Sequence, residues 1–489
     1  MPASITLSNL AWSTPDGRPV LSNLDLSFGS ERTGLVGRNG TGKSTLLKLI
    51  AGDLSPQSGE VSITGTLGML RQTVQADPRQ TVADLFGVAE ALALLRRAER
   101  GDADADALAH ADWTLEARMA AALDRLGLQA GAHTLLSTLS GGQRTRIGLA
   151  ALVFNQPDFI LLDEPTNNLD REGRRAVIDL LVAWRGGAIV VSHDRELLET
   201  LDAIVELGGL GATRYGGNFS HYRERKALEL AAAQHDLADA DKRVAEVAER
   251  AQATAERKAR KDRAGQRKRA KGDMPRIQLN TLRNRSEATS ASNVRLAERR
   301  RAQALDDAAS ARERIEVLQP LTVTVPSTGL PAGKTILKIE AASVGYDDRP
   351  VIRHLSFAIT GPERIAVDGP NGSGKTTLLA LITGRLAPWT GTVRLMADWA
   401  MLDQQVGLLD PSASIRDNFR RLNPRADENA CRASLARLMF RADAALQVVA
   451  SLSGGQLLRA GLACVLGTAP PQLLILDEPT NNLDLDSIA

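Results

Sequence analysis

The sequence predicts an α/β protein in which two copies of one domain are joined by a long antiparallel helical linker. Three observations point to this fold class: several motifs occur twice in the same order, apolar strand-like runs precede them, and a heptad pattern of apolar residues lies between the copies. A length of 489 residues fits about three units at roughly 150 residues each. We expect these units at residues 1–222, 223–320 and 321–489.

The composition is that of an ordinary globular protein from a reducing compartment. Lys and Arg number 60 against 58 Asp and Glu, and 43% of the residues are hydrophobic, enough to fill cores. The 2 cysteines are too few for a disulfide framework and lack metal-ligand spacing. The N-terminus lacks a secretory-signal pattern, and no apolar run approaches the ~20 residues of a membrane-spanning helix. We therefore expect a cytoplasmic protein that does not enter the membrane.

The same motifs recur at nearly constant spacing. GRNGTGKST at residues 37–45 returns 332 residues later as GPNGSGKTT, whereas LSGGQ and LDEPTNNLD return at offsets of 313 and 314. The change in offset means that the first copy carries a net 19 extra residues ahead of LSGGQ. Repetition of the whole set in one order indicates two copies of one domain.

The first repeated motif is a glycine-rich loop of the form GxxxxGK[ST], which predicts phosphate binding between a strand and a helix. Its glycines let backbone N–H groups close on phosphates, and the N-terminus of the following helix favours negative charge. We expect Lys43 and Lys375 to contact the β- and γ-phosphates, and Ser44 and Thr376 to bind Mg²⁺. A glycine-rich turn without function is a poor explanation, because both matches lie in register with the other repeats. The predicted loops comprise Gly37, Arg38, Asn39, Gly40, Thr41, Gly42, Lys43, Ser44 and Thr45 in the first copy, and Gly369, Pro370, Asn371, Gly372, Ser373, Gly374, Lys375, Thr376 and Thr377 in the second.

Two adjacent carboxylates follow an apolar strand-like run in each copy. We expect Asp163 and Asp477 at the carboxyl end of a strand, where they can hold the Mg²⁺ of a bound nucleotide. Glu164 and Glu478 would then polarise the water that attacks the γ-phosphate. An isolated Asp-Glu pair is more often a solvated surface pair. The preceding apolar run and the repeated Pro-Thr-Asn-Asn-Leu-Asp that follows favour the catalytic interpretation.

LSGGQ, placed between a glutamine and the LDEPTNNLD segment, resembles the signature of the ATP-binding cassette family. The resemblance implies two P-loop NTPase cassettes that bind ATP and Mg²⁺, hydrolyse ATP, and close head to tail within one monomer. Each signature would open a helix whose N-terminus faces the γ-phosphate held by the opposite cassette. The resemblance also implies that Gln72 and Gln404 help to bind Mg²⁺. The implied signature residues are Ser140, Gly141, Gly142 and Gln143, and Ser453, Gly454, Gly455 and Gln456, and the implied D-loop residues are Asp170 and Asp484.

Three further residues extend this resemblance. His193, in Ser-His-Asp after a β-rich run, resembles the family's switch histidine, which contacts the γ-phosphate; a lone histidine is more often structural, but this context favours the switch. The second copy has no counterpart within this sequence, so we expect that cassette to be incomplete and its site to be impaired. Trp12 and Tyr346 lie about 25 residues before the two loops, where cassettes often stack an aromatic ring on adenine. Packing in the core is the alternative for both.

The segment between the copies carries a concentrated positive charge. Residues 221–320 contain 24 Lys and Arg against 16 Asp and Glu, and residues 251–301 contain 16 against 5. Charge on an exposed helix is usually a solvated face, but an excess of this size over so short a segment favours nucleic-acid binding.

The same segment has a helical pattern. Apolar a/d heptads predict two antiparallel helices, the first at about 222–262, with Gly265, Gly272 and Pro275 breaking the pattern at a basic tip. The predicted seam residues are Leu230, Ala233, Leu237, Ala240, Val244, Val247, Ala251 and Thr254 in the first arm, and Val294, Ala297, Ala304, Ala308, Ala311, Ile315 and Leu318 in the second.

Two cassettes, a basic two-helix linker and no membrane segment resemble the ABC-F family of translation factors. YGGNFSHYRERK at residues 215–226 is similar to that family's segment leading into the linker, and the resemblance covers essentially the whole chain. It implies an ATPase that binds the ribosome, with the linker reaching toward P-site tRNA and rRNA. Two alternatives stay open: the ATPase subunit of a membrane transporter, which does not require such a linker, and a DNA-associated ATPase.

Overall fold

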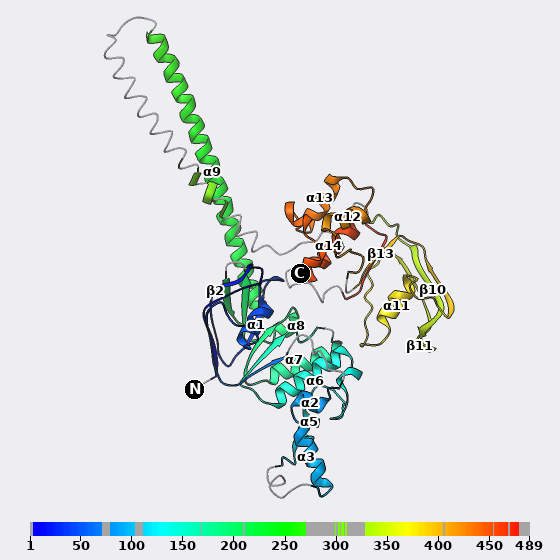
Figure 1. Cartoon of the computed structure of the whole chain (residues 1–489). Coiled ribbons are helices and arrows are strands. Elements are labelled where there is room, and N and C mark those ends of the chain that lie inside the picture. The colour runs from blue at the N-terminus through cyan, green and yellow to red at the C-terminus, as the bar shows by residue number, and fades with distance from the viewer. Residues whose placement is uncertain are drawn as a thin grey trace. The chain divides into compact units, whose positions relative to one another are not determined.

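The computed structural model describes residues 3–70, 79–102, 111–167, 169–208, 211–269, 299, 302–303, 305–307, 309–310, 328–403, 406–452, 454–467 and 470–478 (Figure 1). It divides into two compact units, Met1–Ser220 with Leu321–Ala489, and His221–Pro320. The first unit contains both copies of the repeat, and each copy has hydrophobic cores of its own.

The first copy contains two β-sheets. A three-stranded antiparallel sheet has the order β2-β1-β4, and a six-stranded sheet has the order β5-β6-β7-β3-β8-β9, in which only the β8–β9 pair is antiparallel. β6 and β7 are buried along their whole length, as expected for parallel strands covered on both faces. The strands are β1 (Ser4–Ser13), β2 (Pro19–Phe28), β3 (Arg32–Val36), β4 (Ser58–Thr64), β5 (Leu67–Leu70), β6 (Phe159–Asp163), β7 (Gly187–Val191), β8 (Ala203–Gly208) and β9 (Gly211–Gly216).

This topology brings three motifs to one edge of the larger sheet. Because β3, β6 and β7 are parallel, their carboxyl ends at Val36, Asp163 and Val191 lie along the same edge. The glycine-rich loop, the acidic pair and the Ser-His-Asp segment all begin there. The helices of this copy are α1 (Lys43–Ile50), α2 (Val82–Phe86), α3 (Ala89–Glu99), α5 (Leu115–Asp124), α6 (Gly141–Phe154), α7 (Arg171–Ala183) and α8 (Arg195–Leu198), with a 3-10 turn η1 (Leu136–Thr138).

The second copy repeats part of this arrangement. Its antiparallel sheet has the order β11-β10-β12, equivalent to β2-β1-β4, and β13 pairs in parallel with β14 as β5 does with β6. The strands are β10 (Lys334–Tyr346), β11 (Arg349–Gly361), β12 (Thr390–Leu395), β13 (Trp399–Leu402) and β14 (Leu473–Leu476). The helices are α11 (Lys375–Ile382), α12 (Ile415–Leu422), α13 (Glu428–Arg437) and α14 (Gly454–Leu466), with 3-10 turns η2 (Ala442–Leu446) and η3 (Val449–Ser451).

One sequence-based expectation fails in this copy. The residues before the second glycine-rich loop, 364–367, form no strand, and the side chains of Ile365 and Val367 are 53% and 47% exposed. In the first copy the equivalent β3 pairs with β7 and β8. Among the residues described for the second copy, no strand pairs with this segment.

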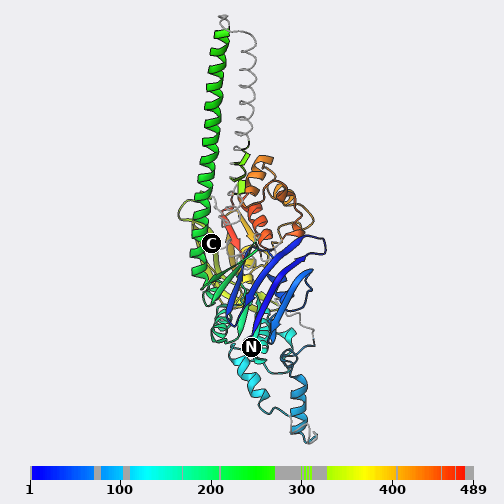
Figure 2. The same ribbon diagram turned by 90° about the vertical axis from the view of Figure 1, so that its left-hand side faces the viewer.

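The described part of the second unit lies mainly in α9 (Phe219–Arg269), a helix of 51 residues whose first two residues belong to the first unit and which is unbroken in both views (Figures 1 and 2). At ~1.5 Å per residue it spans about 75 Å. The sequence-based boundary at about residue 262 was wrong, because the helix continues through Gly265. A single glycine costs a helix only about 1 kcal/mol relative to alanine, which neighbouring helix-forming residues can offset.

The buried face of α9 follows the predicted heptads. Six predicted seam residues, Leu230, Ala233, Leu237, Ala240, Val244 and Val247, are buried or half-buried, while most of their neighbours are exposed. In the predicted second arm, the structure describes helical residues at 299, 302–303, 305–307 and 309–310. All of the predicted seam residues of that arm lie outside the described residues. The predicted helix breakers Gly272 and Pro275 lie outside them as well. Across the described part of the chain, none of the helices is both long enough and apolar enough to cross a membrane.

Candidate nucleotide-binding sites

The glycine-rich loop of the first copy connects β3 to α1 and needs its glycines for steric reasons. Gly37 has a φ of 143°, and a Cβ atom there would lie 2.2 Å from the carbonyl oxygen of Leu207. Gly42 has a φ of 93°, and a Cβ atom there would lie 2.7 Å from a methyl group of Val20. Only glycine fits both positions, so the backbone can curl closely around the N-terminus of α1.

The lysine of the loop makes the same contacts in both copies. Lys43 is buried, and its Nζ donates hydrogen bonds to the carbonyl oxygens of Gly37, at 2.6 Å, and Arg38, at 3.1 Å. Lys375 donates to the corresponding carbonyl oxygens of Gly369 and Pro370. α1 and α11 begin at these lysines with no acidic residue in the first turn, so each helix N-terminus is suited to an anion.

The first copy brings its predicted Mg²⁺ ligands together. Asp163 ends β6 and is 4% exposed, and the hydroxyl group of Ser44 lies close enough to its carboxyl group to stabilise the charged form. Burial raises the pKa of Asp163, and the Ser44 hydroxyl group and the charges of Lys48 and Lys43 oppose that rise. The Oδ1 atom of Asp163 is buried and has no hydrogen-bond partner among the described groups. A hydroxyl and a carboxylate with an unused oxygen are a donor set that fits Mg²⁺.

The acidic pair of the second copy is less enclosed. Asp477 and Glu478 directly follow β14 and are half-buried. Burial raises the pKa of Asp477, and the negative charges of Glu478 and Asp403 raise it further. Glu478 has a φ of 48°, close to the 50° of Glu164, so the backbone turns in the same way after both strands.

In the first copy, Glu164 and His193 are direct neighbours. The Nε2 atom of His193 lies 3.2 Å from Oε1 of Glu164, and the backbone N–H of His193 donates to Oε2 at 3.4 Å. The backbone N–H of Glu164 donates to the carbonyl oxygen of Val191, which fixes the turn. Burial raises the pKa of Glu164 to about 8, although the charge of Lys43 opposes this. The predicted water-polarising carboxylate and switch histidine therefore lie at one point of the sheet edge.

The LSGGQ segment of the first copy opens a helix, as predicted. Ser140 caps α6: its hydroxyl accepts a hydrogen bond from the N–H of Gln143 at 3.2 Å, and its own N–H donates to the Gln143 side chain at 2.9 Å. Gly141 is exposed, and a Cβ atom built there would meet nothing within 4 Å. In the second copy α14 begins at Gly454.

Asp170 caps α7, and its Oδ1 accepts a hydrogen bond from the N–H of Gly173 at 2.9 Å, which lowers the pKa of Asp170. The remaining predicted site residues, Gln72, Gln404, Ser453 and Asp484, lie outside the described residues.

The two aromatic candidates differ in their surroundings. Trp12, on β1, is partly buried and packs against the core of the first copy. Tyr346 ends β10 and is 52% exposed, so its ring is accessible to a planar ligand. The position of Trp12 agrees with the core-packing alternative, whereas that of Tyr346 leaves the stacking role open.

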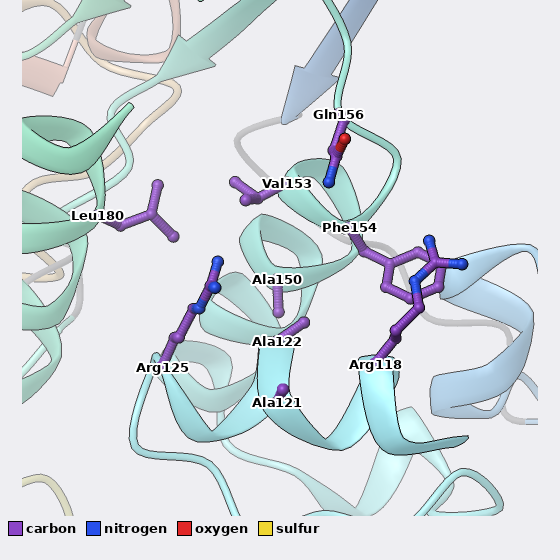
Figure 3. A pocket seen from close by; sticks show the side chains of 9 residues that line it. All are labelled: Arg118, Ala121, Ala122, Arg125, Ala150, Val153, Phe154, Gln156 and Leu180. Atoms are coloured by element: carbon purple, nitrogen blue, oxygen red, sulfur yellow. The ribbon is translucent and has the colours of Figure 1, made fainter. Parts of the chain in front are cut away.

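A cavity of about 160 Å³ lies apart from the predicted site residues, between α5, α6 and the side chain of Leu180 on α7 (Figure 3). Its walls are mostly alanine, valine and leucine, with two arginines. One of these, Arg118, lies over the ring of Phe154 at 4.8 Å and pairs with Asp112 at 2.7 Å. None of the predicted site residues lines it, so it is not the nucleotide site.

Sequence reasoning missed two residues of the first site. Arg174 on α7 pairs with Asp194, the residue directly after His193. Asp194 could have been noticed as the last residue of the Ser-His-Asp segment. No local sequence pattern indicates Arg174 as a site residue, because its partner is 20 residues away and is reached only in the folded chain.

Comparison with known proteins gives a consistent result. The family described as "ABC transporter" matches residues 21–167 and 352–481. The tylosin resistance ATP-binding protein TlrC of Streptomyces fradiae is 33% identical, over 96% of this chain and 88% of that protein. The energy-dependent translational throttle protein EttA of Mycobacterium tuberculosis is 30% identical, over 96% and 82%. The ATP-binding protein Uup of Haemophilus influenzae is 30% identical, over 99% and 73%.

Proposed function

This chain belongs to the ABC-F group of the ATP-binding cassette family and is an ATP hydrolase, and from that premise we propose that it acts on the ribosome in its ATP-bound form. The observation that carries the proposal is α9, a 51-residue helix whose last part, 251–269, belongs to the strongly basic segment at residues 251–301. The relationship to a protein named a translational throttle supports the ribosome as the target.

In the proposed first site, the backbone of the loop at 37–42 and the N-terminus of α1 hold the phosphates of ATP. Lys43 exchanges its bonds to loop carbonyl oxygens for bonds to the phosphates. Ser44 and Asp163 would hold Mg²⁺, which would supply positive charge next to the phosphates. The second site uses Lys375, Thr376, Asp477 and Glu478 in the same roles.

For hydrolysis, Glu164 must hold the attacking water as a carboxylate. Without nucleotide, the raised pKa of Glu164 favours the protonated carboxyl group, and its contact with His193 occupies one of its oxygens. In this state Glu164 does not hold the attacking water. We assign His193 to the γ-phosphate, so that nucleotide binding draws the imidazole away from Glu164 and frees the carboxylate for water. The signature helix of the opposite cassette, α14 for this site, closes on the same γ-phosphate.

The linker is the proposed contact with nucleic acid. Within the basic segment, the described side chains of Arg257 and Arg260 on α9 are exposed, so this part of the helix presents cations to its surroundings. Phosphate contacts by such side chains release counterions and make binding salt-dependent. We assign rRNA and tRNA as the ligand. Because only ATP carries the γ-phosphate that both cassettes contact, nucleotide state would control binding, with hydrolysis causing release.

The test uses a chain carrying both Glu164→Gln and Glu478→Gln, which should bind ATP but not hydrolyse it. With ATP it should co-sediment with ribosomes in a salt-sensitive manner, whereas the matched variant carrying Lys43→Met and Lys375→Met should not. Equal co-sedimentation of the two variants would contradict the proposal. Preferential binding to branched DNA would favour the DNA-associated alternative, and stable co-purification with an integral membrane protein would favour the transporter alternative.

A further inference from the structure

An ion pair joins α7 to the segment that carries the switch histidine. On Arg174, both Nε, at 2.9 Å, and a terminal guanidinium nitrogen, at 2.8 Å, donate to Oδ2 of Asp194. The side chain of Asp194 is only 5% exposed, whereas that of Arg174 is 43% exposed. The carboxylate of Asp194 is therefore buried, and water cannot readily replace Arg174 as its hydrogen-bond donor.

The carboxylate of Asp194 is fixed at its other oxygen as well. Oδ1 accepts hydrogen bonds from the backbone N–H groups of Glu196, at 3.1 Å, and Leu197, at 3.4 Å, and so caps α8. The backbone N–H of Asp194 donates to the hydroxyl group of Ser192 at 3.0 Å. These bonds hold the carboxylate in one orientation, and with it the peptide that joins Asp194 to His193.

His193 lies between two fixed points. On one side Ser192, which is fully buried, follows β7; on the other side Asp194 is held by α8 and by Arg174. The imidazole and the backbone N–H of His193 both contact Glu164, so a small rotation at Asp194 changes two contacts of the carboxylate.

Arg174 also lies one turn from the D-loop residue. Its backbone N–H donates to the carbonyl oxygen of Asp170 at 2.9 Å, and Asp170 caps the same helix. α7 thus connects Asp170 at its N-terminus to the histidine segment through a single side chain.

We infer that Arg174 is a positioning residue for ATP hydrolysis: by holding Asp194, it sets the orientation of His193 relative to Glu164 and couples it to the first turn of α7. A merely structural role is less consistent with the contacts. The β6–β7 core is filled by apolar residues, and Arg174 contributes to it only through a half-exposed side chain. The inference rests on the proposed roles of Glu164 and His193.

The test measures steady-state ATP hydrolysis by the full chain without ribosomes. We expect Arg174→Met to lower kcat about tenfold while the KM for ATP changes by less than about twofold, because the loop that holds the phosphates is untouched. Arg174→Lys should recover a substantial part of kcat. The matched control is Arg175→Met, which removes the exposed neighbouring arginine of the same helix and should leave kcat unchanged.

A second variant tests whether the pair acts as a unit. Asp194→Asn should lower kcat as Arg174→Met does, and the double variant should be no slower than the slower single variant. The inference is overturned if Arg174→Met retains kcat, if KM changes instead of kcat, or if the two effects multiply. Thermal unfolding establishes that each variant is folded. If Arg174→Met does not fold, Arg174→Gln, which removes the charge but keeps a polar side chain, is compared with the parent and with Asp194→Asn in the same way and with the same contradicting outcomes.

Two further variants separate this inference from the roles on which it rests. Glu164→Gln and His193→Ala should each abolish most hydrolysis. If both remain active, the proposed roles of these residues are wrong, and the inference falls with them. If both are inactive while Arg174→Met is fully active, only the role of Arg174 is wrong.

Discussion

The Nε2 atom of His193 lies 3.2 Å from Oε1 of Glu164, so an imidazole and a buried carboxyl group share one position at the edge of the large sheet. The side chain of Glu164 is 8% exposed. Burial disfavours the charged carboxylate, so Glu164 remains protonated until the nucleotide binds.

The first prediction concerns the pH dependence of stability. Burial raises the pKa of Glu164 from 4.5 to about 8 in the folded protein. The stabilisation from this group is therefore complete below pH 4.5 and is lost as the pH rises through about 8. Glu164→Gln cannot ionise, so its thermal unfolding midpoint relative to the parent should rise between pH 5 and pH 8, by about 4–8 °C for ~2 kcal/mol.

The measurement is thermal unfolding with EDTA and without nucleotide. Glu196→Gln, at an exposed position on α8, serves as the matched control and should show no such pH dependence. A difference between Glu164→Gln and the parent that stays constant across this pH range would show that Glu164 ionises normally.

The second prediction concerns the loop lysine. Lys43→Met removes a buried ammonium group that is placed to bond phosphates, and hydrogen bonds to charged groups contribute about 1.5–3 kcal/mol. We expect the affinity of the first site for a fluorescent ATP analogue to fall at least about tenfold. Lys242→Met, at an exposed position on α9, should bind the analogue as the parent does. Parent-like binding by Lys43→Met would remove this lysine from the site.

The third prediction tests the close approach at Gly37. Gly37→Ala would place a Cβ atom 2.2 Å from the Leu207 carbonyl oxygen at a φ of 143°. We expect a loss of about 2–4 kcal/mol in stability from strain and overlap, together with loss of nucleotide binding. Gly29→Ala, where a Cβ atom meets nothing within 4 Å, is the control for adding a methyl group. Equal unfolding midpoints for the two variants would mean that the loop does not adopt this conformation.

The fourth prediction concerns the seam of α9. Ala240→Asp places a charge at a position that is 7% exposed, at a cost of about 2 kcal/mol or more. Ala238→Asp adds the same charge two residues away at an exposed position, so the two variants have equal net charge. Limited proteolysis should cut residues 221–320 faster in Ala240→Asp, and ribosome co-sedimentation should fall in that variant alone. Equal loss in both variants would assign the effect to charge.

The sequence predicted the loop, the acidic pair and the signature helix because each is specified by adjacent residues. Lys43, Ser44 and Asp163 lie close together because the carboxyl ends of parallel strands lie along the same edge of the sheet. Each motif follows a strand-like run in the sequence, so their proximity could be predicted. The cap formed by Ser140 and Gln143 is also local, three residues apart.

Features that depend on distant contacts were not predictable in this way. The pairing of Arg174 with Asp194 requires α7 to lie beside the segment that follows β7, and no local pattern in the sequence indicates this. The strand expected before the second loop depends on pairing with strands that are distant in the sequence, as β3 pairs with β7 and β8. The sequence pattern predicts a helix end at about residue 262, ahead of Gly265, whereas the residues on both sides of Gly265 continue α9.

The unbroken course of α9 has a mechanical consequence. A helix about 75 Å long acts as a lever, because its hydrogen bonds run continuously from the first turn to the last. A rotation of about 5° at Phe219 would carry Arg269 through roughly 6 Å, which is enough to break or form a layer of phosphate contacts. Small rearrangements at the base of this helix are therefore amplified along its length into movements on the scale of a nucleotide.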